Sequence, residues 1–343
     1  MPTTVEQLGE GDFALWDAFV DAHPDATFFH RAGWKAVLER SFGHDAPFLM
    51  AKRAGQIVGV LPLVHIRSML FGKSLSSTAF CVEGGPLTND PEAALKLDAA
   101  ALALAGQLGV DYLEYRAPAL GRTGWVEKTG VYAGFHRAIG SDHEQNLRDI
   151  PRKQRAVVRQ SLETGLVSKI EDDVDLNWRL YADSVHRLGT PVFPRRYFAT
   201  LKEVFGPSCE ILNIYHGGEA VAGCLTFYFR QRIMPYYAGG TVAARQYGAH
   251  DFMYWDLIRR GAENGYKMFD FGRSKVGTGP YSFKKNWGFK PTPLVYAYHL
   301  SGGASLPDNN PLNPKYRLMI EVWKRLPLPI ANMIGPLVVR SLG

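Results

Sequence analysis

Hydrophobic residues recur along the chain at two spacings, which predict alternating helices and strands. Trp34, Leu38 and Phe42 are four residues apart, as on one face of a helix that ends at Gly43. Short apolar runs predict strands over 58–66, 112–115, 221–229 and 268–271. Longer amphipathic segments predict helices over 93–108 and 251–264.

The same pattern occurs twice, at an offset of 163 residues. Residues 28–43 align with residues 191–206, where Tyr197, Leu201 and Phe205 take the apolar helix positions before Gly206. The turn at 55–59 aligns with 218–222, and each leads into a strand. Helix, hairpin, strand, helix and strand therefore follow one another in both halves. This order resembles the acetyltransferase-type (GNAT) fold.

We therefore predict an α/β (α+β) protein of two tandem GNAT-like domains, each with a mixed central sheet flanked by helices. The predicted N-terminal domain covers residues 1–143, a basic connecting helix covers 144–165, and the C-terminal domain covers 166–300. A linker rich in Gly, Ser, Pro and Asn and a basic amphipathic tail follow over 301–343.

Length and composition agree with this organisation. The 343 residues, of which 46% are hydrophobic, suffice for two cores. The net charge of +6 suits phosphate-bearing ligands or anionic lipid, and it suits ordinary solubility equally well. Three cysteines without C-x-x-C spacing, and an acidic N-terminal segment unlike a secretory signal, indicate a cytoplasmic protein.

A loop in the second half has the features of a phosphate site. Arg245 and Gly248 precede the helix predicted from Asp251, so backbone N–H groups and the positive end of the helix dipole would face a pyrophosphate. Acetyltransferases carry Arg/Gln-x-x-Gly-x-Gly/Ala here, whereas this chain has His250 at the last position. We assign Arg245, Gly248, His250 and Arg273 to the binding of donor phosphates. A glycine-containing helix entry without a ligand remains an equal alternative.

Two further segments carry candidate chemistry. Asp270 lies in an apolar strand that runs on to Arg273, so its carboxylate is either a catalytic base or half of a structural ion pair. Lys284 follows Tyr281 and Phe283 and precedes Trp287, and these rings would desolvate its ammonium. A fixed ammonium can stabilise the tetrahedral oxyanion of amide formation, although a solvated lysine is the alternative.

The connecting helix carries a row of arginines. Arg148, Arg152, Arg155 and Arg159 recur at steps of four, three and four residues, which places them on one helix face for phosphate or nucleic acid. The histidines and acids show no metal-ligand spacing, so no metal site is predicted, and a G-x-S-x-G elbow is missing from the sequence.

Together these segments resemble the Fem family of non-ribosomal peptidyltransferases, including the FemAB-like proteins associated with exosortase and exopolysaccharide loci. The resemblance extends over residues 28–289 and includes Arg152 to Arg155, Phe269 to Ser274 and Phe283 to Gly288. It also includes the segment that contains Tyr237, Gly239 and Gly240, which with Trp287 we assign to a ligand cleft.

The resemblance implies an N-acyltransferase that forms an amide bond on an amine of a cell-envelope precursor, whether glycan, peptide or lipid. It places Phe283 and Lys284 at the active site, and we add Asp270 and Tyr281 as catalytic candidates. The chain lacks the coiled-coil insertion of some members, so acyl-CoA, acyl carrier protein and aminoacyl-tRNA all stay open as donors. No tightly bound cofactor is expected.

Two other functions remain open, a non-catalytic adaptor for lipid-linked exopolysaccharide intermediates and an RNA-binding module. The tail over 316–342 mixes apolar and basic residues, so it would either lie on an anionic membrane surface or pack back on the protein. If it binds lipid, we expect the protein at the inner face of the cytoplasmic membrane. The sequence does not indicate the oligomeric state.

Overall fold

The computed structural model describes residues 1–68, 71–307 and 314–342, without the side chains of 314–317. The chain divides into two compact units. The first unit comprises Met1–Gly130, Leu294–Asn309 and Val338–Gly343, and the second comprises Val131–Pro293 and Asn310–Leu337.

The second unit is built on a seven-stranded mixed sheet in the order β14-β8-β13-β12-β11-β10-β9. Its strands are β8 (Tyr132–Ala138), β9 (Val167–Ile170), β10 (Cys209–His216), β11 (Glu219–Phe229), β12 (Arg232–Gly240), β13 (Met268–Lys275) and β14 (Pro291–Pro293). Its helices are α4 (His143–Arg148), α5 (Arg152–Leu162), α6 (Val174–Leu188), α7 (Arg195–Phe205), α8 (Ala249–Glu263) and α9 (Gly279–Asn286), with 3-10 turns at η3 (Gly206–Ser208) and η4 (Val242–Arg245).

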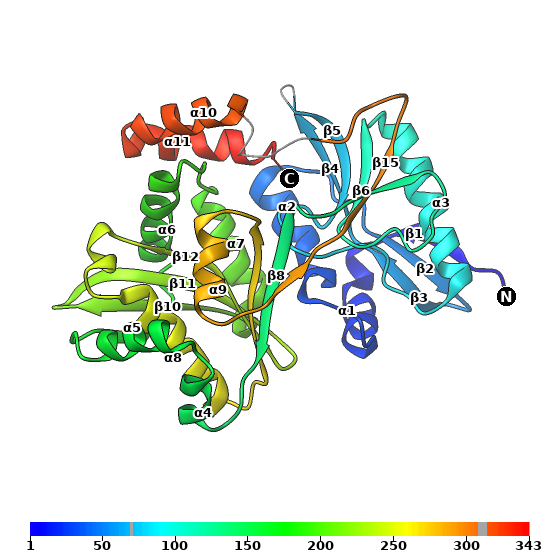
Figure 1. Ribbon diagram of the computed structural model, residues 1–343. Coiled ribbons are helices and arrows are strands. Elements are labelled where there is room, and N and C mark those ends of the chain that lie inside the picture. Colours follow the sequence, from blue (N-terminus) through cyan, green and yellow to red (C-terminus); the bar gives the residue numbers. More distant parts are fainter. Residues whose placement is uncertain (69–70, 308–313, 343) are drawn as a thin grey trace. The chain divides into compact units, whose positions relative to one another are not determined.

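Helices cover both faces of this sheet (Figure 1). Successive residues of a strand point to opposite faces. A side chain at Gly239 would collide with the backbone of Leu180 on α6, whereas one at Gly240 would meet His250 on α8. The α6 and α7 helices therefore cover one face of the sheet, and α8 covers the other. Figure 1 shows α6 and α8 on the two sides of strands β10 to β12.

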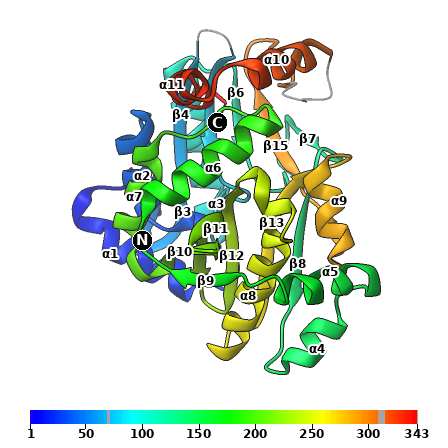
Figure 2. The ribbon, with the colours of Figure 1, turned by 90° about the vertical axis from the view of Figure 1, so that its left-hand side faces the viewer.

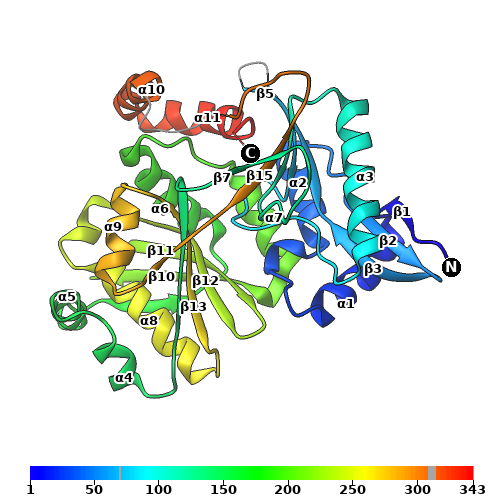
Figure 3. The ribbon, with the colours of Figure 1, turned by 45° about the vertical axis from the view of Figure 1, so that its right-hand side comes forward.

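The first unit has a related plan with its sheet in two parts. The parts are ordered β1-β2-β3 and β4-β5-β6-β15-β7. The strands are β1 (Thr4–Gln7), β2 (Leu49–Arg53), β3 (Gln56–Leu61), β4 (Leu63–Ser68), β5 (Gly72–Ser77), β6 (Tyr112–Tyr115), β7 (Trp125–Lys128) and β15 (Tyr296–Leu300). The helices are α1 (Phe13–Ala22), α2 (Gly33–Phe42) and α3 (Pro91–Leu108), with 3-10 turns at η1 (Glu10–Asp12) and η2 (Phe28–His30). Figure 3 shows α3 beside β2 and β3.

The duplicated pattern is present in both units. The α2 helix ends at Gly43 and α7 at Gly206, as the aligned sequences predict. The β2–β3 and β10–β11 hairpins turn through two residues of positive φ, Ala54-Gly55 and Gly217-Gly218. This backbone matches the right-handed twist of paired strands. The predicted mixed α/β class, with two main mixed sheets flanked by helices, is confirmed.

Proline changes two predicted elements. The strand expected over 58–66 is split into β3 and β4 at Pro62, which has no N–H for the ladder. The single helix expected over 144–164 is two helices, because Pro151 starts α5 in an extended conformation with ψ 142° and disfavours helical backbone at the preceding residue. Arg148 therefore lies on α4, apart from the other arginines.

The division between the units also differs from the predicted ranges. β8, placed by sequence in the N-terminal domain, pairs with β13 of the second unit. β15, placed in the C-terminal domain, lies between β6 and β7 of the first unit. Each half of the sequence thus supplies one strand to the sheet of the other. Alternation within a short strand gives its buried face but not its partner, so the sequence carries no signal for this exchange.

The C-terminal segment forms α10 (Pro314–Arg325) and α11 (Leu328–Val339). Residues 308–313 of the predicted linker, and the side chains of Tyr316 and Arg317 in the predicted tail, lie outside the described residues. Within the part of the chain that the structure describes, no helix has the length and apolar character needed to cross a bilayer.

Candidate active site

The candidate site lies where β12 and β13 of the second unit separate. These parallel strands are paired only through Arg232–Met268 and Ile233–Phe269. Beyond this point β13 is bulged between Asp270 and Arg273, with Gly272 at a φ of +62°. Backbone groups that leave a ladder need other partners. The diverging strand edges can therefore hydrogen-bond to an extended ligand.

Asp270 shapes this bulge. Its Oδ1 accepts a hydrogen bond from the backbone N–H of Gly272 at 2.8 Å, and its Oδ2 lies 3.6 Å from Nη1 of Arg232. The ion pair expected from the sequence is thus made with Arg232. Arg273 instead has its guanidinium 4.6 Å from the ring centroid of Tyr132, in cation–π geometry. The contacts of Asp270 are those of a residue that positions the strand.

Lys284 reaches the bulge from α9. Its Nζ donates to the carbonyl oxygens of Phe271 at 2.6 Å, Arg273 at 3.0 Å and Gly272 at 3.5 Å. Burial lowers the pKa of Lys284 from its ordinary 10.5 to about 8, while Asp270 raises it and Arg273 lowers it. The side chain therefore carries a proton below about pH 8. The ammonium of Lys284 is thus held at the point where β13 separates from β12.

Aromatic rings lie beside this ammonium, but the nearest two are not the sequence neighbours that were expected to desolvate it. Nζ of Lys284 lies 5.6 Å from the ring centroid of Phe135 and 5.8 Å from that of Phe271. Phe283 packs near the ring of Tyr254 on α8, with centroids 5.8 Å apart. Tyr281 meets Phe135 edge-on at 5.3 Å. These rings exclude water from the lysine, which is the physical cause of its lowered pKa.

The phosphate loop predicted from the sequence leads into α8. Gly248 is the N-cap, in the left-handed conformation with φ 65°, and no side chain caps this end of the helix. The first N–H groups of a helix have no partner within the helix. Arg245 is exposed and makes no ion pair with any residue that the structure describes. The open helix end and a free guanidinium therefore lie within one loop.

The equivalent helix of the first unit is closed. Oδ1 of Asp90 accepts from the backbone N–H groups of Glu92 at 2.9 Å and Ala93 at 3.2 Å, which caps α3. Asp90 also forms an ion pair with Arg53. A carboxylate thus occupies the anion position at α3, whereas no side chain caps the end of α8.

His250 lies on the inner side of the loop. Its Cε1 is 2.9 Å from the position that a Cβ on Gly240 would take, so the imidazole packs against the end of β12. Burial lowers the pKa of His250, and the Arg187 guanidinium lowers it further. The ring is neutral at pH 7. His250 therefore contributes no positive side-chain charge to a phosphate, and its predicted part in donor binding stays a prediction.

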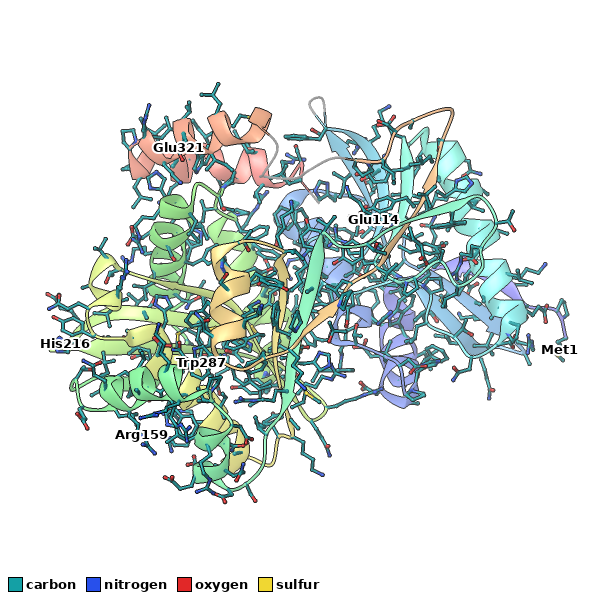
Figure 4. The ribbon with its side chains drawn as sticks, viewed as in Figure 1. Met1, Glu114, Arg159, His216, Trp287 and Glu321 are labelled. Carbon is teal, nitrogen blue, oxygen red and sulfur yellow. The ribbon has the colours of Figure 1, made fainter. Side chains whose placement is uncertain are left out.

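The basic helix α5 packs directly against the loop. A Cβ at Gly248 would lie 3.1 Å from Cβ of Ser161, and Oγ1 of Thr164 donates to the carbonyl of Tyr247 at 3.3 Å. Three guanidiniums on α5, from Arg152, Arg155 and Arg159, form no ion pair within the described part of the chain. Figure 4 labels Arg159. Arg148 on α4 is 3.6 Å from Asp142. Three of the four predicted arginines thus share a helix beside the loop.

Asp251 is a residue of this site that the sequence analysis missed. Its Oδ1 accepts from Nε2 of Gln154 at 2.6 Å and from Nε1 of Trp287 at 3.0 Å, which joins α8 to α5 and α9. Burial raises the pKa of Asp251 from 3.8 to about 6, although these hydrogen bonds lower it. An acid in the first turn of a helix is common. That position alone therefore gave no signal of a link to Trp287.

The four residues assigned to a ligand cleft, Tyr237, Gly239, Gly240 and Trp287, are buried. Tyr237 is buried on the α6–α7 face, where its hydroxyl lies 2.8 Å from that of Tyr197. Gly239 allows the α6 backbone to approach the sheet. Trp287 is fully buried in the core on the opposite face. Apolar and glycine-rich segments suit both cores and clefts, and here these residues form the core.

This arrangement of strands and helices defines a class of fold. A parallel β12–α8–β13 crossover with separating strands and an uncapped helix end is the βαβ half of a GNAT domain. Residues 145–285 match the family described as Acetyltransferase (GNAT) domain, so the second unit carries a GNAT acyltransferase domain. No curated protein matches the sequence.

Several solved structures share the fold of this chain. The crystal structure of FemX is similar with a TM-score of 0.67 at 14% identity, covering 92% of this chain and 100% of that one. A tandem GNAT protein from the clavulanic acid biosynthesis pathway gives 0.55 at 13% identity, covering 88% and 100%. L-PGS from Bacillus licheniformis gives 0.52 at 15% identity, covering 86% and 96%.

Proposed function

We propose that this protein is an N-acyltransferase with one active site, in the second unit. It transfers an acyl or aminoacyl group from a phosphate-bearing donor to an amine of a cell-envelope precursor. The donor is an acyl-CoA, an acylated carrier protein or an aminoacyl-tRNA, and the acceptor is a glycan, peptide or lipid amine. The GNAT domain supports the reaction class. The classes of donor and acceptor follow from the Fem-like motifs.

The difference between the two helix ends is the observation that carries this proposal. Asp90 caps α3 in the first unit, whereas α8 has no side-chain cap and lies beside α5, which carries Arg152, Arg155 and Arg159. All three donor classes carry phosphate groups. An uncapped helix end and guanidiniums without ion pairs bind phosphate through N–H donors and positive charge.

Lys284 supports the chemical step. The acceptor nitrogen attacks the carbonyl carbon of the donor, and the new C–N bond forms as the carbonyl becomes an oxyanion. The oxyanion then collapses, the bond to the donor sulfur or oxygen breaks, and the nitrogen loses a proton to the leaving group or to water. A protonated Lys284 stabilises the oxyanion when one of its three carbonyl hydrogen bonds is exchanged. Asp270 acts by holding the bulge.

A donor panel tests the phosphate site. The protein is incubated with acetyl-CoA, an acylated carrier protein or aminoacyl-tRNA, each with a sugar amine, a peptide amine and an aminolipid, and amide products are measured by mass spectrometry. We expect one donor class to give an amide. We expect the double variant R152A/R155A to lower kcat/KM for that donor at least about tenfold, through loss of charge-assisted hydrogen bonds.

Arg148 provides the matched control. It lies on α4, is paired with Asp142 and is separated from α5 by Pro151. The R148A variant should therefore keep the wild-type kcat/KM. If kcat/KM fell equally in R148A and R152A/R155A, the arginines of α5 would not form a specific phosphate site.

The hydrogen bonds that Lys284 already makes favour one alternative function, a non-catalytic adaptor that holds lipid-linked intermediates. Its Nζ already has three carbonyl partners, which a purely structural lysine would also have. The same panel separates the two functions. An adaptor yields no amide with any of the donors, while an enzyme yields an amide with at least one.

A further inference from the structure

The last two helices carry apolar side chains on faces that no described residue covers. In α11, Ile330, Met333 and Leu337 are 40%, 70% and 66% exposed. Their spacing of three and four residues places them along one stripe. The helix contains no charged residue. The outward stripe is therefore apolar along the length of α11.

The inner face of α11 is apolar too. Ala331 and Val339 are buried, and Gly335 packs so closely that a Cβ there would lie 2.9 Å from the backbone N of Val192. These positions follow the helix repeat on the side opposite the exposed stripe. A helix that is hydrophobic all round is normally covered on every side. The outer stripe of α11 thus lacks the cover that its composition requires.

The α10 helix has the same division. Leu318, Met319 and Val322 are 71%, 50% and 53% exposed. Ile320 is turned the other way, against Gly189 at the end of α6. Nε2 of His186 lies 2.9 Å from the carbonyl oxygen of Leu326, which fixes the turn after α10. Figures 1 and 2 show α10 and α11 together beyond α6.

Charge indicates what covers these stripes. Residues 314–343 contain five basic residues and only one acidic residue, Glu321 (labelled in Figure 4). Arg325 and Arg340, near the ends of the two helices, are exposed. Apolar stripes flanked by cations suit the interface of an anionic bilayer, where apolar side chains enter the acyl region and cations meet the headgroups. A second copy of the same face would bring like charges together.

We propose that α10 and α11 form a docking face for the surface of an anionic lipid bilayer, on which the protein lies peripherally. The outer stripes enter the interface, while Arg325 and Arg340 contact the lipid phosphates. This surface is separate from the residues of the candidate active site. Its test uses no acyl donor, so its failure is independent of a failure of the acyltransferase function.

Vesicle flotation of the full chain tests the apolar part. We expect binding to vesicles of phosphatidylglycerol and phosphatidylcholine, and at least about tenfold weaker binding to phosphatidylcholine alone. The double variant M333D/L337D should lower binding to the anionic vesicles at least about tenfold, because it puts charge into the apolar stripe. Leu95 on α3 is 71% exposed, so L95D is the matched control and should bind as wild type.

A charge reversal tests the basic part. R325E/R340E should bind anionic vesicles at least about tenfold more weakly than wild type. This difference should become smaller as the salt concentration is raised. Circular dichroism melting must show the variants folded. The proposal is overturned if wild type does not float with anionic vesicles, or if L95D loses as much as M333D/L337D. It is also overturned if light scattering shows that M333D/L337D turns a dimer into a monomer with vesicle binding unchanged.

Discussion

Asp251 is the residue where burial and charge conflict most plainly. Its carboxylate lies in the first turn of α8 and binds Gln154 and Trp287 through one oxygen. Burial raises its pKa to about 6, so the folded protein holds this proton more tightly than the unfolded chain does. The free energy of unfolding therefore falls as pH rises from about 4 to about 6. Above pH 6 the carboxylate is charged, and this loss of stability persists in full.

Replacing Asp251 with Asn tests this cost. An asparagine oxygen accepts the same two hydrogen bonds without a charge, so we expect Asp251→Asn to be more stable than wild type at pH 7 by about 1 to 2 kcal/mol. The two proteins should differ little at pH 4. Urea unfolding at both pH values measures the difference. A variant that is less stable than wild type at pH 7 would contradict the assignment.

Sequence reasoning predicted aromatic surroundings for Lys284 but not the rings that supply them. Tyr281, Phe283 and Trp287 flank Lys284 in the sequence, whereas the rings that lie beside its ammonium belong to Phe135 and Phe271. Asp251 was missed because its partners, Gln154 and Trp287, are distant in the sequence. Trp287 was assigned to a cleft because one sequence does not tell a buried ring from a ligand-binding ring.

At the scale of elements, the close packing of α6 on the sheet depends on Gly239. A side chain there would clash with the backbone of Leu180 and Tyr181. We expect Gly239→Ala to lower the free energy of unfolding by about 2 to 3 kcal/mol, because backbone cannot move aside as a side chain can. Urea denaturation measures the change.

Gly106 in α3 provides the comparison for this prediction. A Cβ there meets nothing within 4 Å, and its φ is not positive. Gly106→Ala should therefore stabilise the protein by up to about 1 kcal/mol through helix propensity. If Gly106→Ala lowered the free energy of unfolding as much as Gly239→Ala does, the close approach of α6 would not be the reason for the loss of stability in Gly239→Ala.

The elements themselves were largely predictable, because their apolar periodicity is local. The helix over 93–108 and the strand over 112–115 were found within a few residues of α3 and β6. The break at Pro151 was signalled by the proline itself, but the even spacing of the arginines outweighed it. The spacing of residues within α5 does not predict that this helix packs against Gly248, because that contact depends on tertiary packing.

For the whole molecule, the exchange of strands makes each unit depend on both halves of the chain. β15 lies between β6 and β7, and hydrogen-bonds to both. A fragment ending at residue 143 has no such strand, so β6 and β7 would present unpaired edges. We expect fragment 1–143 to aggregate or melt without cooperativity, as measured by circular dichroism.

Residues 294–301, joined to that fragment through a Gly/Ser linker, should restore a cooperative transition, because they contain β15. If fragment 1–143 melts cooperatively without them, the exchanged strand is not needed for the first unit. The duplication was visible in the sequence as a repeat of apolar positions. The exchange was not, since either half offers strands of suitable length.

The central claim is that protonated Lys284 stabilises the oxyanion of amide formation, and its most direct test is the pH dependence of kcat with the active donor of the panel. The rate should fall as pH rises through about 8, where Lys284 loses its proton. Lys284→Met should lower kcat about 100-fold or more, whereas Lys284→Arg, which stays charged, should lack the fall near pH 8. Lys285→Met, an exposed neighbour, should match wild type. A wild-type kcat in Lys284→Met would contradict the account.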